Sequence, residues 1–484
     1  MTTKSKILLI AIPVLIAVAV GAYFLSRGTS TAYLNALPKD ATALARHDVR
    51  ALLEEAELTK EETSELLQRY SLLEDNKADI GVDFSLPIYL FAGREGNFGL
   101  VAPVTDGDDL TAWLKNLAAK GHASEVMQQR GYSWVVVEEK WVMAFDDEKA
   151  VAMGPAVGAP QDQLRTIIAQ LMKQGADESA LQTELYQLLG TKNDPLVAAV
   201  RPELLPKDML GALSFLDLKT SQQGLFRLSL EPDDEELELD IDIISDDPDV
   251  QAELKKVNAL LRPIAGRLVD NAHTQNALWM ALNTQGEELL KVLRSDASLR
   301  TTLLSLNFIV DVDRMIQAID GDVTLELMSA KATPETGGNL QFNFDFKDAT
   351  FLAQVSNTDF LSGASSWGNT FINVTPLSLT EYVVNIEPSP IHFGVKDKTL
   401  YVSAERGPVT EGNAYLRNQR DDIHGARFYA TLNLTSIPLE PVSILSKIYP
   451  DLSRLDVKMG DAGEFTFTLK ASDDTNILRT LLRL

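Results

Sequence analysis

The feature that most constrains the fold of this chain is an order of secondary-structure patterns that occurs twice. In the first pass, a short apolar run at residues 37–45 precedes a helical pattern from 48 to about 73, a turn and strand at 80–91, and a strand at 98–103. The second pass has a strand at 277–282, a helix at 286–306, and a turn and strand at 319–327. A recurring order of this kind indicates one structural design used twice.

The later parts of the two passes also correspond. The first continues with a helix at 107–120, strands at 132–137, 141–145 and 150–153, a helix at 161–189, strands at 196–200, 211–217, 224–230 and 236–244, and a helix at 248–269. The second continues with strands at 351–355, 382–386, 392–395 and 399–402, a short helix at 359–367, a strand at 426–434, a helix at 441–448, strands at 455–459 and 464–469, and a helix from 472. Alternating residues Phe342, Phe344 and Phe346 indicate one further strand.

Runs of strands interrupted by a few helices are typical of α+β proteins, whose antiparallel sheets carry helices on one face. We therefore predict an α+β fold with two related halves, at residues 33–270 and 271–484, each mainly antiparallel sheet covered by helices. The total of 484 residues agrees with more than one domain.

The N-terminus predicts a membrane anchor. Residues 7–25 carry no charge and are almost all apolar, and a helix of that length spans about 28 Å, close to the thickness of a bilayer core. Lys4 and Lys6 precede this stretch, which favours a cytoplasmic tail at residues 1–6, a tether at 26–32, and everything beyond it in the periplasm. The alternative is a cleaved signal peptide, whose apolar region is usually shorter.

Charge and cysteine content exclude several classes of function. The chain has 44 Lys and Arg against 69 Asp and Glu, for a net charge of −25, and no basic stripe that could bind nucleic acid. There is no cysteine, which excludes disulfides, thiol nucleophiles, thiolate metal sites and lipidation at a cysteine.

No motif of the sequence predicts a catalytic, cofactor-binding or metal-binding residue. The five histidines have neither a second histidine nor a carboxylate at the spacing of metal ligands, and we interpret them as structural: His47, His122, His273, His392 and His424. Residues 363–368 approach the G-x-S-x-G motif but contain one residue too many. The glycine-rich residues 93–99 lie between two strands and open no helix, so they fit a hairpin loop better than a phosphate-binding loop.

The densest acidic segment, residues 231–249, contains a strand in which apolar and acidic residues alternate. Asp240 and Asp242 hint at a calcium loop, but Ile244 and Ser245 stand where that loop needs a ligand and a glycine. We interpret the segment as a solvated sheet face or edge, with weak cation binding or a basic partner as the alternative.

The tryptophans all fall on apolar faces of predicted elements: Trp113, Trp134, Trp141, Trp279 and Trp367. Core packing is the first interpretation of these residues. A glycan-binding platform would need two or more aromatic side chains exposed together, which the sequence alone does not show.

Several short motifs occur in an order that resembles a known family. They are Leu37-Pro38-x-Asp40-Ala41, the segment 80–91 (IGVDFSLPIYLF), Gly131-Tyr132, the segment 171–174 (LMKQ) and the segment 392–401 (HFGVKDKTLY). With these motifs the chain resembles the Bacteroidetes envelope lipoproteins grouped as domain of unknown function 4836. The resemblance implies an envelope location and gives no catalytic residue to transfer. Family members carry a lipobox cysteine, and its absence here implies an anchor at residues 7–25 in the inner membrane.

The sequence therefore favours a non-catalytic binding or scaffolding module of the envelope, anchored in the inner membrane through residues 7–25, with envelope proteins or polysaccharide as partners and no cofactor. One alternative is an envelope hydrolase with a dispersed carboxylate or serine site, which requires a pocket with paired carboxylates or a serine–histidine contact. The other is a periplasmic assembly chaperone, which requires a large exposed apolar patch.

Overall fold

The computed structural model describes residues 31–59, 62, 80–93, 96–156, 158, 160–204, 224–295, 297–308, 310–329, 331–334, 340–343, 348–367, 372–386, 389–410, 412–436, 451–472 and 475–482. The predicted membrane span at residues 7–25 lies outside these residues, as do most of the helical pattern at 48–73, the strand at 211–217 and the helix at 441–448. Within the described residues, no helix is long and apolar enough to cross a membrane.

The chain divides into two compact units. Unit 1 is formed by the described residues of Met1–Asp247 and Asp474–Leu484, and unit 2 by those of Pro248–Asp473. The last helix, α15 (Ile477–Leu482), thus belongs to unit 1, where Leu478 packs with Leu52 and Ala56.

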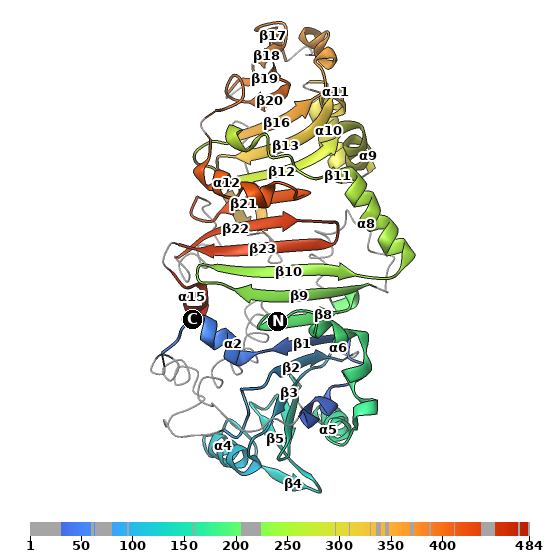
Figure 1. Cartoon of the computed structure of the whole chain (residues 1–484), viewed down its shortest axis with the longest axis vertical. Coiled ribbons are helices and arrows are strands. Elements are labelled where there is room, and N and C mark those ends of the chain that lie inside the picture. The colour runs from blue at the N-terminus through green and yellow to red at the C-terminus, as the bar shows by residue number, and fades with distance from the viewer. Residues whose placement is uncertain are drawn as a thin grey trace. The chain divides into compact units, whose positions relative to one another are not determined.

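Unit 1 is built on an antiparallel sheet in which each neighbouring pair is antiparallel (Figure 1). Its strands, in sheet order, are β4 (Met127–Gln129), β5 (Tyr132–Val137), β6 (Trp141–Phe145), β7 (Lys149–Gly154), β3 (Phe98–Pro103), β2 (Ile88–Ala92), β1 (Ala43–His47), β8 (Leu196–Val200), β9 (Leu225–Pro232) and β10 (Glu236–Ile244).

Unit 2 is also built on an antiparallel sheet. Its strands, in sheet order, are β17 (Val374–Pro376), β18 (Glu381–Val384), β19 (Ile391–Lys396), β20 (Thr399–Ser403), β16 (Ala349–Val355), β13 (Ile319–Leu327), β12 (Leu278–Gln285), β21 (Phe428–Asn433), β22 (Leu452–Met459) and β23 (Glu464–Ala471). The short β11 (Leu261–Arg262) pairs with β12, and β14 (Lys331–Pro334) forms a hairpin with β15 (Leu340–Asn343).

The two sheets have the same topology. Apart from β11 and the hairpin β14–β15, the strands of each unit, counted along the chain, occupy the same successive places in the sheet. In both units the first strand is central, and it pairs with the second strand on one side and the eighth on the other. Two sheets of one chain with this order are two copies of one design.

The predicted fold class is wrong in its balance of helix and sheet. The described residues form a large antiparallel β-structure of 21 sheet strands with few helices, and they give no support to a transmembrane helix. The predicted helix at 161–189 is wrong beyond Leu171, where α5 ends; Gly175 is extended, and only 3₁₀ turns and the short α6 (Glu184–Leu189) follow it. Likewise, the predicted helix at 248–269 ends as α8 (Pro248–Leu260), where β11 begins.

Apolar cores lie on both faces of the unit 1 sheet. Alternation along β5 sends Val135 into the core beneath α4 (Gly107–Ala119), whereas Tyr132, Trp134 and Val136 pack against the core beneath α5 (Pro160–Leu171). Figure 1 shows α4 and α5 on either side of β5. The aromatic side chains of β5 and the side chains of α5 therefore face each other across the space between these two elements.

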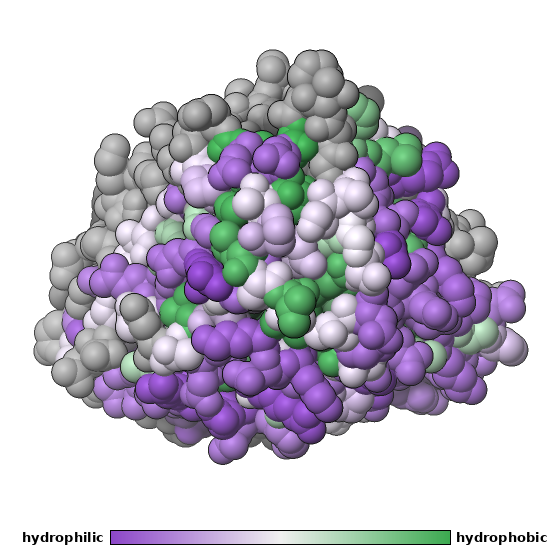
Figure 2. Space-filling view, turned by 90° about the horizontal axis from the view of Figure 1, so that it is seen from above, coloured by the Kyte–Doolittle hydropathy of each residue, from purple (hydrophilic) through white to green (hydrophobic). Residues whose placement is uncertain are grey.

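Some large apolar side chains remain at the surface of unit 2. Val292 of α9 (Gly286–Ser295), Leu299 and Leu304 of α10 (Ala297–Asn307), and Phe308 are exposed. Figure 2 shows one face of the molecule on which apolar stretches lie near the middle, interrupted by polar side chains and bordered by a broad hydrophilic rim.

Candidate functional site

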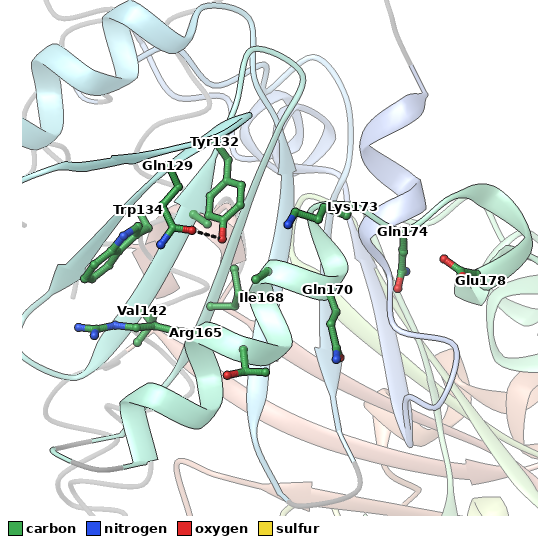
Figure 3. Close-up of a pocket in the computed structure, with 13 residues that line it drawn as sticks. Gln129, Tyr132, Trp134, Val142, Arg165, Ile168, Gln170, Lys173, Gln174 and Glu178 are labelled. Atoms are coloured by element: carbon green, nitrogen blue, oxygen red, sulfur yellow. Dashed lines mark hydrogen bonds between the residues drawn. The ribbon is translucent and has the colours of Figure 1, made fainter.

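A groove of about 800 Å³ lies in unit 1, between the strands β4, β5 and β6 and the helix α5. Figure 3 shows strand residues on one side and helix residues on the other. Its lining consists of Gln129, Tyr132, Trp134, Val142, Ala144, Arg165, Thr166, Ile168, Ala169, Gln170, Lys173, Gln174 and Glu178.

On the strand side of the groove, two aromatic side chains follow a tight hairpin. Gln129 pairs with Tyr132, so only Arg130 and Gly131 connect the strands, and Gly131 takes a φ of 90° that suits glycine. Tyr132 and Trp134 are two residues apart and therefore lie on the same face of β5. The Tyr132 hydroxyl donates to Gln129 Oε1 at 2.6 Å, which fixes the ring beside the amide.

The helix side is set by the amphipathic pattern of α5. Leu164, Ile168 and Leu171 are buried in the core at helical spacing, and this leaves Arg165 and Lys173 to line the groove. At the start of the helix, the side-chain amide of Gln161 donates to the carbonyls of Glu139 (2.8 Å) and Ala156 (3.0 Å). These bonds tie α5 to the turn between β5 and β6.

Arg165 and Trp134 link the two sides. The guanidinium carbon of Arg165 lies 4.0 Å from the centroid of the Trp134 ring, a cation–π contact. Arg165 Nη1 donates to Asp162 Oδ1 at 3.1 Å. Arg165 Nε is buried and has no hydrogen-bond partner among the described residues.

The floor of the groove is apolar and rigid. Val142 and Ala144 of β6 and Ile168 of α5 are each at most 2% exposed. Ala144 stands opposite Trp134 in the strand register, and its small side chain leaves room beside the indole. At the far end, Gln174 Nε2 donates to the carbonyls of Asn35 (2.5 Å) and Leu37 (2.8 Å), which holds the segment after α5 in place.

This lining is suited to holding a ligand. Aromatic faces over an apolar floor provide contact area, and the amides and charged groups around them provide orientation. The lining includes no histidine and no close pair of carboxylates, so the groove does not have the constellation that the hydrolase interpretation requires.

A second, smaller cavity of about 320 Å³ lies in unit 2 and includes Arg262, Arg267 and Asp320. Arg262 Nη2 donates to Asp320 Oδ1 at 3.0 Å, and its Nε donates to Asn283 Oδ1 at 2.9 Å. The neighbouring Asp322 is buried and accepts from the backbone N–H groups of Ala265 and Arg267. These bonds fasten the segment 262–267 to β13, which is a structural role.

None of the five histidines lines either of these cavities. His47 is buried on β1, and both of its ring nitrogens lack a partner in the described part of the chain. His122 is exposed and lies 2.7 Å from Glu138. His273 Nδ1 lies 2.6 Å from Glu326 Oε2, and this buried carboxylate also accepts from Asn276 Nδ2, so it fastens the loop before β12.

The acidic strand is neutralised by its neighbours. Asp242 accepts from Arg227 at 2.6 Å and Asp240 accepts from Lys192 at 3.0 Å, and these four side chains are half-buried. Among the described residues, no group of three or more His, Cys, Asp or Glu is placed to hold a metal. The two aspartates that hinted at calcium are therefore bound to basic side chains of unit 1.

The other glycine-containing segments lie away from the groove. The described residues of 93–99 connect β2 and β3, with Gly93 N–H donating to the Asn97 carbonyl. Ser366 donates to the Gly363 carbonyl in a 3₁₀ turn, and Gly368 lies outside the described residues.

Sequence reasoning missed the groove, although it named Trp134. The signal that was present is the pair Tyr132 and Trp134 on one strand face together with Arg165 and Lys173 eight residues apart on a helix. That the two elements face each other follows from tertiary packing, which neither pattern contains.

The comparisons with known proteins identify a family and give little beyond it. The family model described as domain of unknown function (DUF4836) matches residues 33–410. No curated protein matches the chain. Among solved structures, crystal form IV of TP0453 is 10% identical and covers 43% of this chain and 79% of its own. Crystal form I of TP0453 is 13% identical and covers 49% of this chain and 89% of its own. Their TM-scores of 0.27 and 0.29 are too low to support an inference.

Proposed function

We propose that this chain, which belongs to the DUF4836 family, is a binding module that holds a polysaccharide segment in the groove of unit 1. The observation that carries the proposal is the placement of Tyr132 and Trp134 side by side on one strand face, above an apolar floor and next to three glutamines. Sugar rings have apolar C–H faces and hydrogen-bonding edges, and aromatic rings with adjacent amides complement both. The volume also lies within the range of known ligand sites.

We infer further that the module works in the cell envelope. The basic residues Lys4 and Lys6 before an apolar stretch are typical of exported proteins, which supports this location. Fractionation of cells that produce the tagged full chain tests it, since recovery with cytoplasmic markers would contradict an envelope location.

The binding proposal is tested by isothermal titration of the full chain against a panel of hexasaccharides. We expect at least one of them to bind with an affinity that Tyr132→Ala lowers about tenfold, because the ring loses apolar contact worth about 1–2 kcal/mol. Gln170→Ala removes one exposed amide of the lining and should cost about fivefold.

The matched control is Gln163→Ala, an exposed glutamine of the same helix that does not line the groove. Equal losses for Gln163→Ala and Gln170→Ala would show that the helix, and not the groove, is affected. Binding of extended peptides with no binding of any saccharide would replace a polysaccharide by a protein segment as the ligand.

A chaperone function has one observation in its favour. Leu304 and Phe308 in unit 2 are 67% and 68% exposed, close in sequence to the exposed Val292 and Leu299. Exposed apolar side chains of this kind bind partly folded chains if they form a contiguous surface. Suppression of the aggregation of a denatured test protein, lost on Leu304→Ser, is the result that would favour it.

A further inference from the structure

We propose that the polysaccharide bound in the groove is acidic, and that Arg165 binds its carboxylate or phosphate group. This inference rests on the proposed function and deepens it by naming the class of ligand. It is carried by the unpaired hydrogen-bonding edge of one guanidinium group and by a second cation, Lys173, that lines the same groove just beyond the end of α5.

The guanidinium of Arg165 is hydrogen-bonded on one side only. Nη1 donates to Asp162, whereas Nε is buried without a partner in the described part of the chain, and no bond from Nη2 is formed there either. Nε and Nη2 make the fork that matches the two oxygens of a carboxylate or phosphate. A buried donor left unpaired is unfavourable, and an acidic group at this edge would remove the cost.

Trp134 orients that fork. The guanidinium carbon lies 4.0 Å from the centroid of the indole ring, so the group is restrained against one wall of the groove. Asp162 restrains the other end of the group. Since the side chain is already held from two sides, it loses little freedom when a ligand binds.

A second positive charge lies farther along the groove. Lys173 follows Arg165 by eight residues, two positions past the end of α5, and lines the same groove. Its side chain is exposed and makes no hydrogen bond or ion pair within the described residues. The lining thus has two cations and a single acid, Glu178 at the far end, in a chain of net charge −25. The lining therefore differs from the acidic average of the chain, and a local excess of cations of this kind favours an anion.

The test compares matched pairs of hexasaccharides, one member acidic and the other neutral. The first pair is oligogalacturonate and its methyl ester. The second pair is a phosphorylated mannan and its dephosphorylated form. We expect the acidic form of one pair to bind at least tenfold more tightly than its neutral partner. Arg165→Gln should abolish most of that difference.

Arg165→Lys keeps the charge but loses the fork, so it should recover only part of the preference. Lys173→Gln should weaken binding of the acidic form about threefold, and the affinity that remains should depend less on salt concentration. Lys115→Gln on α4, an exposed lysine outside the groove, is the control and should change nothing. Tryptophan fluorescence and hydrogen exchange of α5 check that each variant folds.

The outcomes separate the two proposals. Equal binding of the acidic and neutral forms would overturn the acidic ligand and leave the polysaccharide module in place. Preference for the acid that survives Arg165→Gln would overturn the role of Arg165. Failure of every pair to bind would overturn both proposals.

Discussion

Acid should destabilise unit 1 through His47, and the size of the effect follows from its burial. This side chain is 1% exposed on the central strand β1, and neither ring nitrogen has a partner among the described residues. Burial disfavours the charged imidazolium and lowers its pKa from 6.5 to about 4, against a smaller opposing effect of the Asp48 carboxylate.

The sign follows from proton binding. Since the pKa is lower in the folded state, the unfolded state takes up the proton first, and stability is lost as the pH falls from about 6.5 towards 4. A difference of about 2.5 pKa units corresponds to about 3.4 kcal/mol at the limit, of which about 2 kcal/mol is lost by pH 5.

The assay is hydrogen exchange followed by mass spectrometry on peptides that cover β1, β2 and β8, at pH 7.5 and pH 5, with rates corrected for the intrinsic effect of pH. His47→Leu should remove the acid-dependent loss and also raise stability at pH 7.5, because two unpaired buried nitrogens are gone. The control is His122→Leu, since His122 is exposed. If His47→Leu keeps the acid-dependent loss of the wild type, the reasoning from burial is refuted.

Three further predictions concern stability. Leu478→Ala should destabilise unit 1 by about 2–4 kcal/mol, because this buried side chain packs on Leu52 and Ala56. Faster hydrogen exchange in α2 (Val49–Glu55) checks this prediction, and faster exchange in unit 2 instead would contradict it. Gly81→Ala should cost clearly more than Gly96→Ala in urea unfolding, since both have positive φ but only at Gly81 would a Cβ collide with the Asp106 carbonyl; equal costs would refute the steric argument. Arg406→Gln should raise the pKa of Glu381 from about 2 and so weaken the part of unit 2 stability that is present above pH 4.5 and lost as the pH falls towards 2. Because Arg406 is half-exposed, we expect only a small shift of the urea transition at pH 7, and an unchanged pKa of Glu381 would contradict the pairing.

The sequence predicted the strands of this chain better than its helices. The strands at 98–103, 132–137, 141–145, 196–200 and 236–244 are confirmed at both ends. Alternation of apolar residues in short segments such as these leaves few other structures possible. Helical periodicity is less decisive, because 3₁₀ turns and bends also bury residues three or four apart. The segment after Leu171 keeps that spacing although the helix ends at Leu171 and Gly175 is extended.

The groove was beyond the reach of sequence patterns for a different reason. Trp134 lies on an apolar strand face, which predicts core packing, and Arg165 lies between buried positions of an amphipathic helix. Only the packing of α5 across β5 brings the guanidinium onto the indole and leaves the strand face partly open. Local patterns specify which face of an element is apolar, whereas the tertiary arrangement decides how much of that face is covered.

The groove of unit 1 is the proposed binding site, and hydrogen exchange with and without a bound hexasaccharide tests this most directly. We expect the ligand to slow exchange in the β4–β5 hairpin, at residues 127–134, and in α5 and the following turn, at residues 165–174, and to leave the remaining strands of unit 1 and all of unit 2 unchanged. Protection that falls in unit 2 or on the far face of the unit 1 sheet, with none at Trp134 or Arg165, would contradict it.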